Sequence, residues 1–388
     1  MSKIVHLSSV HPPFDTRIFV KECRTYREAG FEVGLVVPYP QDEVVDGVFV
    51  RAITKQPNRW KRFTRTIPQL YRRAVAEKAA IYHFHDPELI PVGLLLKLRG
   101  ARVIYDVHED VPRQILIKNW IPKWARKGVS FAVELAERVA MQFFDGIVAA
   151  TPTIARRFPP HKTIVVQNYP LLEEFVDQQG QPPAQREPIV AYVGAINVER
   201  GIREMVKAME QLSPHLNARL VLAGEFSEND DTDDLLQSPG WKSVELLGWS
   251  SRQQVRHLLS RARVGLVTLH PTETYVVSNP VKLYEYMAAG MPVVASDFPM
   301  WRDIVTTADC GLLVDPLNST EIARAITWLL EHPQEAEAMG KRGREAVLER
   351  FNWQPEGNRL VDFVSHFIAT NPRCSSGAQR IAETLSAA

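Results

Sequence analysis

The sequence predicts an α/β protein built from two Rossmann-like, doubly wound domains. Apolar runs alternate with helical patterns along the whole chain, and a polar, proline-bearing stretch at residues 173–188 interrupts this alternation once. Strands that alternate with helices of this length imply right-handed βαβ units and parallel sheets. A chain of 388 residues is also long enough for two separate cores.

Six apolar runs in the first half are typical of buried strands, and helical patterns lie between them, for example over residues 17–29 and 123–143. The runs are KIVHLSS, EVGLVVP, AIYHFH, RVIYDVHE, GIVAA and TIVVQN. They predict a first Rossmann-like domain over residues 1–170, followed by a linker over residues 171–187.

A second series of strands begins at PIVAYVG and continues through ARLVLAG, VELLGW, RVGLVTL, MPVVAS and GLLVD. It predicts a second domain over residues 188–352. Helical patterns then cover residues 319–331, 335–350 and 354–369, and the sequence permits the last helix (353–370) to cross back to the first domain. The small, polar tail at 371–388 is expected to be flexible.

Composition excludes several classes of protein. The formal net charge of +1 argues against a general nucleic-acid binder. Three scattered cysteines form neither a disulfide framework nor a zinc motif, which suits a reducing compartment. The start MSKIVHLSSV lacks the apolar core of a secretory signal, and no apolar run is long enough to span a membrane. We therefore expect a cytoplasmic location.

The most informative segment is NPVKLYEYMAAGMPVVASDF, residues 279–298. Asn279 suits a helix N-cap and Pro280 the first helical position, while Gly290 stands where the helix must end. A helix N-terminus attracts anions, and Lys282 and Glu285 follow it closely. The segment could hold a diphosphate and a sugar hydroxyl, although local physics alone slightly favours a well-capped helix with solvated side chains.

A second segment, YVGAINVERGIREMV, places a loop between a strand and a helix. The strand ends at Gly194, where a glycine lets the backbone approach a ligand closely. Arg200 at the end of the loop could bind phosphate oxygens with its forked guanidinium. An ordinary turn with a surface arginine is the alternative, since the loop is neither GxGxxG nor a P-loop.

Histidines follow the strands of the first half. His85 lies in HFHDPEL and His108 in YDVHED, and either could donate to a sugar hydroxyl or move a proton. Satisfied structural histidines are the alternative, but two at strand ends favour a site. The loop SSVHPPFDTRIF adds His11, Asp15 and Arg17, where Asp15 could simply cap a helix or the loop could close over a ligand.

Two further patterns leave alternatives open. Asp231 and Asp233 have the spacing of a metal-binding DxD, but no strand positions them, so a solvated turn or helix cap is favoured.

Cationic and aromatic residues interleave at 58–73 (NRWKRFTRTIPQLYRR) and 118–128 (KNWIPKWARKG). This composition suits an anionic membrane surface about as well as a solvated face.

Taken together, these segments resemble the retaining glycosyltransferases of family 4, which have the GT-B fold. PVKLYEYMAAGMPVVASDFP resembles the donor-site helix of the family, and HDPEL, YDVHE, YVGAINVERG and VELLGW follow the family's order over roughly residues 3–369. The resemblance implies two Rossmann-like domains facing across a cleft, with the acceptor on the first domain and the nucleotide sugar on the second.

The resemblance also assigns roles to single residues. Glu285 matches the glutamate that holds the ribose hydroxyls, Arg200 falls where a diphosphate-binding lysine is common, and His108 matches a histidine near the reacting sugar. Lys282 adds positive charge, as in similar members. The remaining implied donor residues are Gly194, Asn279, Pro280 and Val281 at the phosphates, and Leu247 and Gly248 near the base; His11, Asp15, Arg17 and His85 are assigned to the acceptor side of the cleft.

Two positions depart from the family pattern. Val277 stands where a second glutamate usually contacts the donor sugar, and Ala195 replaces a common arginine after the strand-end glycine. These departures leave the donor sugar unassigned.

The expected activity is transfer, with retention, from a UDP-sugar or a GDP-sugar to a hydroxyl of a saccharide or lipid-linked acceptor in glycan biosynthesis. No metal or other cofactor is expected, and an anionic membrane is the expected contact of residues 58–73 and 118–128. The alternatives are a GT-B epimerase or hydrolase, or a non-catalytic nucleotide-sugar-binding or membrane scaffold protein.

Overall fold

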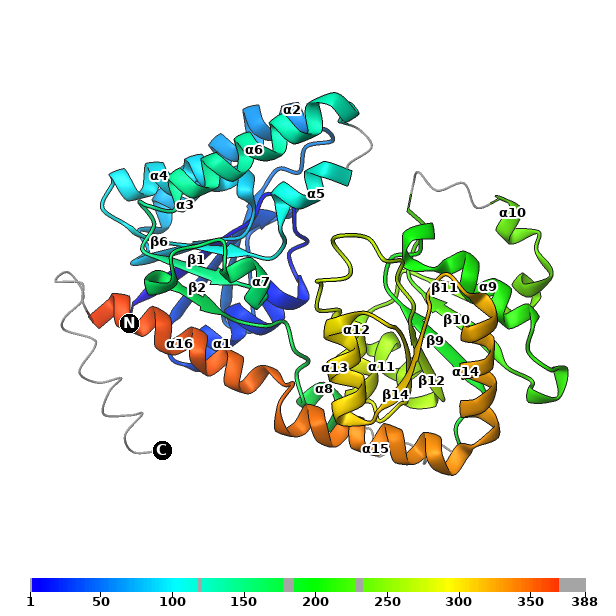
Figure 1. Ribbon diagram of the computed structural model, residues 1–388. Coiled ribbons are helices and arrows are strands. Elements are labelled where there is room, and N and C mark those ends of the chain that lie inside the picture. The colour runs from blue at the N-terminus through cyan, green and yellow to red at the C-terminus, as the bar shows by residue number, and fades with distance from the viewer. Residues whose placement is uncertain (1, 118–120, 177–184, 228–232, 370–388) are drawn as a thin grey trace. The chain divides into compact units, whose positions relative to one another are not determined.

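The computed structural model describes residues 2–117, 121–176, 185–227 and 233–369, which form two compact units (Figure 1). The first unit contains the chain up to Asn168 and the segment from Trp353 onward, and the second runs from Tyr169 to Asn352. The chain therefore passes between the units twice. The predicted tail at 371–388 and the centre of the predicted linker lie outside the described residues.

The first unit contains an eight-stranded sheet in the order β3-β4-β2-β1-β5-β6-β7-β8. Its strands are β1 (Lys3–Leu7), β2 (Glu32–Pro38), β3 (Glu43–Val45), β4 (Val48–Ile53), β5 (Ile81–Phe84), β6 (Arg102–Val107), β7 (Gly146–Ala149) and β8 (Thr163–Val165). All pairings are parallel except that of β3 with β4. This short hairpin at the sheet edge was not predicted from the sequence.

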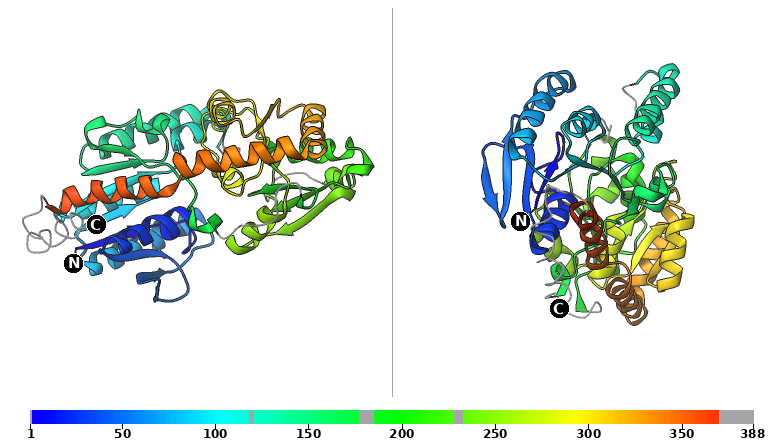
Figure 2. Two further views of the ribbon diagram at one scale, coloured as in Figure 1. Left: turned by 90° about the horizontal axis from the view of Figure 1, so that it is seen from below. Right: turned by 90° about the vertical axis from the view of Figure 1, so that its left-hand side faces the viewer.

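Helical segments cover both faces of this sheet (Figure 1). They are η1 (Thr16–Cys23, π-helical), α1 (Arg24–Glu28), α2 (Arg59–Lys61), η2 (Arg62–Thr66), α3 (Ile67–Glu77), η3 (Pro87–Leu89), α4 (Ile90–Leu98), α5 (Val111–Ile117), α6 (Lys123–Ala140), α7 (Pro152–Ala155), η4 (Pro160–Lys162) and α16 (Trp353–Ala369). In Figures 1 and 2, α16 runs beside α1. It is held by hydrogen bonds from Trp353 Nε1 to Thr25 Oγ1 (2.9 Å) and from Gln167 N to Glu356 Oε2 (2.8 Å).

Alternate residues of the central strands separate the two faces of the first sheet. On one face, Val5 and Leu7 of β1 join an apolar core with α3, α4 and the end of α6. On the other face, β1 presents His6, which is fully buried. The second face therefore carries polar side chains inside the unit.

The second unit contains a fully parallel six-stranded sheet in the order β11-β10-β9-β12-β13-β14. Its strands are β9 (Ile189–Val193), β10 (Arg219–Ala223), β11 (Val244–Gly248), β12 (Val264–Val267), β13 (Val293–Ser296) and β14 (Gly311–Val314). Its helical segments are α8 (Glu173–Val176), η6 (Val198–Arg200), α9 (Ile202–Glu210), η7 (Pro214–Leu216), α10 (Asp233–Leu236), η8 (Pro239–Ser243), α11 (Arg252–Arg261), α12 (Val281–Ala288), α13 (Pro299–Ala308), α14 (Ser319–Glu331) and α15 (Pro333–Glu349).

Both faces of the second sheet are apolar. One face packs on α11, α12, α13 and α15, and the other packs on α9 and α14. Neighbouring residues of β9 divide between the two cores, since Ala191 belongs to the first and Val190 and Tyr192 to the second. A parallel sheet covered on both faces is the doubly wound arrangement predicted from the sequence.

Two local predictions need correction. The predicted linker contains the short helix α8, so it is not wholly irregular. The donor-site helix begins at Val281 rather than at Pro280, because Pro280 itself occupies the N-cap position. The side-chain oxygen of Asn279 accepts a hydrogen bond from Tyr284 Oη at 2.5 Å. Asn279 therefore precedes the helix and contacts one of its side chains.

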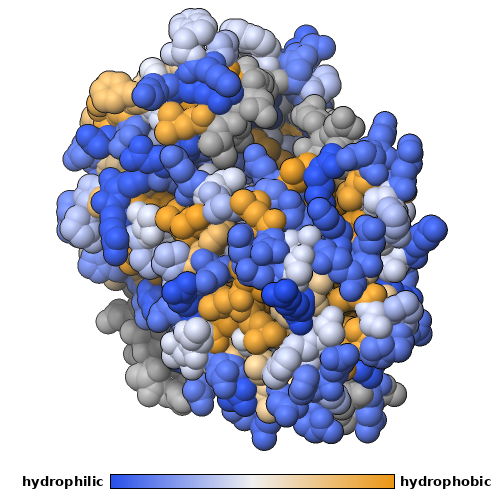
Figure 3. Space-filling model, turned by 45° about the vertical axis from the view of Figure 1, so that its right-hand side comes forward, coloured by the Kyte–Doolittle hydropathy of each residue, from blue (hydrophilic) through white to orange (hydrophobic). Residues whose placement is uncertain are grey.

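The face seen in Figure 3 carries small groups of hydrophobic residues between hydrophilic ones. None of the described helices combines the length and the apolar content required to cross a bilayer.

Candidate active site

At the carboxyl edge of the second sheet, two backbone loops pack directly against each other. Gly194, after β9, has a φ of +121°, which favours glycine. A Cβ placed on Gly224, after β10, would lie 1.9 Å from the carbonyl oxygen of Gly194. Gly194 is therefore favoured by its backbone conformation, and Gly224 is required by the close approach of the Gly194 backbone.

Two cations meet above Gly194. A Cβ built on this glycine would lie 3.2 Å from Lys282 Nζ and 3.4 Å from Arg200 Nη1. Arg200 is placed by Asn197, whose side chain accepts from Arg200 N at 2.9 Å, and by Tyr275, whose Oη accepts from Arg200 Nε at 3.4 Å. The sequence-predicted residues Gly194, Arg200 and Lys282 are therefore brought together.

The ammonium group of Lys282 is buried without a hydrogen-bond partner among the described residues. Its Nζ lies 3.8 Å from the centre of the Tyr192 ring, which provides a cation–π contact. Burial lowers the pKa of Lys282 well below its usual range, and the neighbouring charge of Arg200 lowers it further. An anion placed here would satisfy a group that the free protein leaves unpaired.

The helix α12 is fixed to the sheet by aromatic side chains. Tyr286 Oη accepts from Val193 N at 2.9 Å, and the Tyr286 ring covers Gly265 of β12. Because α12 follows a parallel strand, its N-terminus and first free N–H groups lie at the carboxyl edge, beside Lys282.

Glu285 lies on α12 and is almost fully buried. Its Oε1 accepts from Arg252 Nη1 at 2.7 Å, and Arg252 also pairs with Glu174 of α8. These ion pairs outweigh the effect of burial and raise the pKa of Arg252, the charge of Glu285 contributing most. Neither Arg252 nor Glu174 could be identified from the sequence, because neither belongs to a motif and both come from segments distant from Glu285.

Leu247 and Gly248 end the edge strand β11. Gly248 is in register with Ala223 of β10 and has a φ of +70°, while Leu247 is exposed. They lie at the same edge as Gly194, two strands away in the sheet order.

In the first unit, the predicted histidines lie at the carboxyl ends of neighbouring strands. His85 follows β5 and His108 follows β6, and the His85 Nδ1 is 3.0 Å from the His108 Nε2. The chain of rings continues inward, since His85 Nε2 is 2.9 Å from Nδ1 of His6 on β1. His6 and His83 were not singled out from the sequence, although the alternation in HFH places His83 and His85 on one face.

An ion pair is buried beneath these rings. Arg17 Nη2 lies 3.0 Å from Asp106 Oδ1, and Arg17 Nε lies 3.0 Å from Glu22 Oε1. Burial disfavours the charge of Asp106, but the guanidinium of Arg17 prevails and holds the pKa of Asp106 well below its usual range. Burial and the charge of Asp106 raise the pKa of Glu22 well above its usual range.

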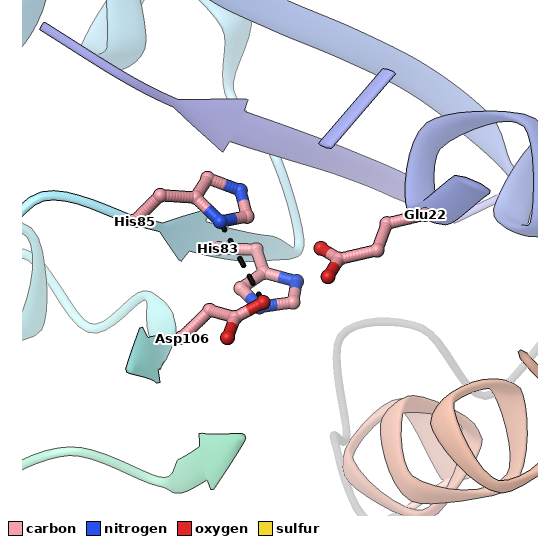
Figure 4. A group of neighbouring side chains, drawn as sticks. All are labelled: Glu22, His83, His85 and Asp106. Carbon is pink, nitrogen blue, oxygen red and sulfur yellow. Dashed lines mark ion pairs between the residues drawn. The ribbon is translucent and has the colours of Figure 1, made fainter. Parts of the chain in front are cut away.

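Figure 4 shows Glu22, His83, His85 and Asp106 converging on one point. Their ligand atoms all lie within 4.8 Å of one another, a set that could surround a metal ion. The guanidinium of Arg17 already balances the charge of Asp106, however, and the raised pKa of Glu22 favours its uncharged form. We therefore interpret the group as an internally neutralised network.

The N-terminal loop is tied to the same edge by Asp86. Asp86 Oδ2 accepts from Ser8 Oγ at 2.9 Å and from Ser9 N at 2.6 Å, and its Oδ1 lies 3.4 Å from His11 Nε2. Asp15 caps η1 by accepting from Arg17 N at 2.8 Å. Burial alone would lower the pKa of His11, but its hydrogen bond with Asp15 and the charge of Asp86 raise it.

The structure places the four predicted acceptor-side residues at two depths. His11 and Asp15 are partly exposed, whereas Arg17 and His85 are buried in the network. Direct contact with an acceptor is therefore available to the first two, and the second two can act only through their neighbours. Of the predicted DxD, Asp231 lies outside the described residues and Asp233 begins α10.

A hydrophobic stripe runs along the outer face of α6. Trp124, Phe131, Leu135 and Val139 are spaced by seven, four and four residues, which places them on one side of the helix. The exposed fractions reach 88% for Trp124 and 67% for Phe131. Only the beginning of this stripe lies within the predicted segment 118–128, of which residues 118–120 lie outside the described residues. In the other predicted segment, Trp60 and Phe63 are also exposed.

Comparisons with known proteins cover nearly the whole chain. The family model described as glycosyl transferase 4-like domain matches residues 17–168, and the one described as glycosyl transferases group 1 matches residues 174–346. An MMP α-(1→4)-mannosyltransferase of Mycolicibacterium hassiacum is 26% identical over 75% of this chain and 72% of its own. An alpha-maltose-1-phosphate synthase of Mycolicibacterium smegmatis is 27% identical over 72% and 76%.

Solved structures show the same fold. Sucrose-phosphate synthase from Thermosynechococcus elongatus has a TM-score of 0.74 and 20% identity, covering 96% of this chain and 100% of its own. Anabaena HepE in complex with UDP-glucose has a TM-score of 0.69 and 17% identity, covering 94% and 100%.

Proposed function

Because the chain belongs to the family-4 type glycosyltransferases with the GT-B fold, we propose that it transfers a sugar from a nucleoside diphosphate sugar with retention of configuration. The acceptor is a hydroxyl of a saccharide or of a lipid-linked saccharide, in the biosynthesis of a glycan. A UDP-sugar is favoured over a GDP-sugar as donor, and the complex of HepE with UDP-glucose supports this choice.

The pair of cations above Gly194 carries the proposal. Arg200 and Lys282 converge at the carboxyl edge of a doubly wound sheet, where such folds bind nucleotides. The N-terminus of α12 adds free N–H groups at the same place. A diphosphate supplies the negative charge and the acceptor oxygens that this arrangement lacks.

The proposed reaction is a front-face displacement. The acceptor oxygen forms a bond to the anomeric carbon on the side from which the diphosphate departs, while the bond from that carbon to the diphosphate oxygen breaks. The departing diphosphate oxygen takes the proton of the acceptor hydroxyl. Arg200, Lys282 and the tip of α12 stabilise the negative charge that develops on the leaving group.

The other roles follow from the assignments above. Glu285 accepts hydrogen bonds from the ribose hydroxyls, held in orientation by Arg252. Leu247 and Gly248 contact the base of the donor nucleotide. His108 donates to the transferred sugar, and His11 and Asp15 contact the acceptor.

Substitutions in the donor site test the proposal. Glu285→Ala is expected to raise the KM for the donor strongly, and Arg200→Ala to lower kcat by about 10²–10³-fold, the usual effect of removing one donor to a developing anion. Arg203→Ala, in the first turn of α9, is the matched control, because Arg203 pairs with Asp234. Product analysis with and without acceptor separates transfer from hydrolysis or epimerisation, and near-normal turnover by Glu285→Ala would refute the donor site.

We propose that the transfer needs no metal, since the side chains of Arg200 and Lys282 supply the positive charge that a metal ion would otherwise provide. Activity is expected to survive EDTA. Loss of activity in EDTA, followed by recovery with Mn²⁺, would instead support a metal site at Asp231 and Asp233.

We also propose that the first unit contacts an anionic membrane, where a lipid-linked acceptor resides. The exposed cations Lys123 and Lys127 flank the beginning of the apolar stripe on α6, and Arg138 near its end pairs with Glu134. Apolar residues with flanking Lys and Arg are the composition of helices that lie in a membrane interface. The stripe is thus a better candidate surface than the predicted segment 118–128 alone.

Flotation with vesicles of phosphatidylcholine and phosphatidylglycerol tests this contact. Wild type is expected to float with the anionic vesicles at low salt. The double variant Phe131→Asp, Leu135→Asp is expected to remain unbound while keeping its activity on a soluble acceptor. Leu348→Asp on α15, an equally exposed leucine of the second unit, is the control. Failure of wild type to bind, or a shift to dimers abolished by the same substitutions, would contradict the membrane proposal.

A further inference from the structure

The three rings His108, His85 and His6 form a chain of two hydrogen bonds from the carboxyl edge of the sheet into its core. His108 Nε2 lies 3.0 Å from His85 Nδ1, and His85 Nε2 lies 2.9 Å from His6 Nδ1. His85 and His6 are buried, whereas His108 is partly exposed. Only the outermost ring can reach a ligand.

The two inner rings are neutral at physiological pH. Burial lowers the pKa of His85 to about 3; the hydrogen bond with Asp106 opposes this shift, and the charges of His83 and His108 add to it. Burial also lowers the pKa of His6 well below its usual range. A neutral imidazole has one N–H, so the two bonds must run in one direction along the chain.

The surroundings of His6, the innermost ring, determine whether both hydrogen bonds point inward or outward. His6 Nε2 is buried and has no hydrogen-bond partner among the described residues. If the bonds ran inward, His6 Nε2 would carry an unpaired buried N–H. If they run outward, the same atom is an unpaired acceptor, which is the less unfavourable of the two. The proton of each inner ring therefore lies on Nδ1, and His85 Nδ1–H donates to His108 Nε2.

The buried carboxylate does not reverse this choice. Asp106 Oδ2 lies 3.4 Å from His108 Nε2 and 3.6 Å from His85 Nδ1, so it attracts a proton on either atom. The guanidinium of Arg17 donates to both oxygens of Asp106 at 3.0 and 3.2 Å. Asp106 thus favours neither direction strongly, and the unpaired atom on His6 decides.

We propose that His85 and His6 are positioning residues that hold His108 as the neutral tautomer with its proton on Nδ1. The Nδ1–H of His108 is then available as a hydrogen-bond donor on the side of the ring that faces away from His85. Only the effect on catalysis rests on the proposed function of His108, because the tautomer itself is a property of the free protein.

Nitrogen NMR of the 388-residue chain with ¹⁵N-labelled histidine measures the tautomer directly, since the two ring nitrogens have different shifts when one carries the proton. At neutral pH we expect the Nδ1–H form for His108. In His85→Phe the donor to Nε2 is gone, and we expect the proton of His108 to move to Nε2, facing Asp106. His85→Asn places an amide N–H near the position of Nδ1, and we expect it to retain the wild-type tautomer.

The same variants give a kinetic readout. His85→Phe is expected to lower kcat roughly tenfold, the effect of losing one hydrogen bond in the transition state, with little change in the KM for the donor. His85→Asn is expected to recover most of this loss. A change of tautomer without a change of kcat would refute the role of His108 in the reaction while leaving the positioning role intact.

His270 of the second unit is the internal control, because its Nε2 lies 2.9 Å from Glu204 and does not depend on His85. An Nε2–H or doubly protonated His108 in the wild-type spectrum would overturn the proposal. This measurement needs no variant, so it decides the question even if His85→Phe fails to fold.

Discussion

The two units treat buried charge in opposite ways. In the first unit, Arg17 and Asp106 neutralise each other beneath the histidines. In the second unit, Lys282 is buried beside another cation, without a hydrogen-bond partner among the described residues. A paired network fixes the positions of its members, whereas an unpaired charge destabilises the free protein and is relieved when an anion binds. The paired network in the first unit holds the histidines in position. The buried Lys282 in the second unit gains a hydrogen-bond partner only when an anion binds, so its burial favours ligand binding.

The largest expected effect comes from breaking the paired network. Arg17→Met leaves Asp106 as an uncompensated buried charge, so the free energy of unfolding is expected to fall by about 3–5 kcal/mol. Urea unfolding measures this change. Arg24→Met is the control, because Arg24 lies seven residues further along at the start of α1 and its partly exposed side chain pairs with Asp46 at the surface. The double variant Arg17→Met, Asp106→Asn is expected to be more stable than Arg17→Met alone; equal stability would show that the charge on Asp106 is not the cause.

A substitution of the unpaired cation is expected to have the opposite sign. Lys282→Met removes a buried amine that has no hydrogen-bond partner among the described residues, so the free energy of unfolding of the free protein is expected to rise by about 1–2 kcal/mol. The stabilisation of the protein by UDP, measured as a shift in Tm, is expected to be largely lost. Lys207→Met on α9 serves as the exposed-lysine control. If Lys282→Met is less stable than wild type, the buried amine does not destabilise the free protein, and this interpretation is wrong.

The pH dependence sharpens the comparison further. The pKa of Lys282 is lowered in the folded protein, so the unfolded chain binds more protons and stability rises with pH. The stability advantage of Lys282→Met over wild type is therefore expected to grow as pH falls from the ordinary lysine value of about 10.4, until it levels off below the folded pKa. Unfolding midpoints at pH 7, 8, 9 and 10 measure this difference, and a constant difference would refute it.

The smallest expected effect is a partial rescue. Ala195 follows Gly194 and is exposed, so a longer side chain can be accommodated there. Ala195→Arg in the Lys282→Met background is expected to restore part of the Tm shift produced by UDP, because it returns a cation to the same loop. Ala195→Leu is the control for the added bulk. No rescue by arginine beyond that by leucine would mean that only the position of Lys282 serves the diphosphate.

The sequence predicted the fold class and most elements because their apolar runs are long and regular. The helix Ser319–Glu331 was predicted with its observed limits. The hairpin of β3 and β4 escaped prediction because its three-residue strand carries little periodicity. In the donor site, Gly194, Arg200 and Lys282 belong to local motifs and could be found, whereas Arg252 and Glu174 meet Glu285 only through the tertiary fold.

The histidine network shows the same limit. His85 and His108 were visible at strand ends, but their burial order depends on the register of β1, β5 and β6, which places His6 opposite His83. The assignment of Arg17 to an acceptor site failed to anticipate that η1 buries its side chain against Asp106. Sequence spacing identified the chemistry of these residues but not their depth.

The double passage of the chain between the units has a consequence for the order of folding during synthesis. The second unit, Tyr169–Asn352, is contiguous, whereas the first remains incomplete until α16 has been made. The bonds of Trp353 with Thr25 and of Glu356 with Gln167 can therefore form only after the second unit has been made. On the ribosome, the later part of the chain can reach its native structure before the earlier part has all its segments.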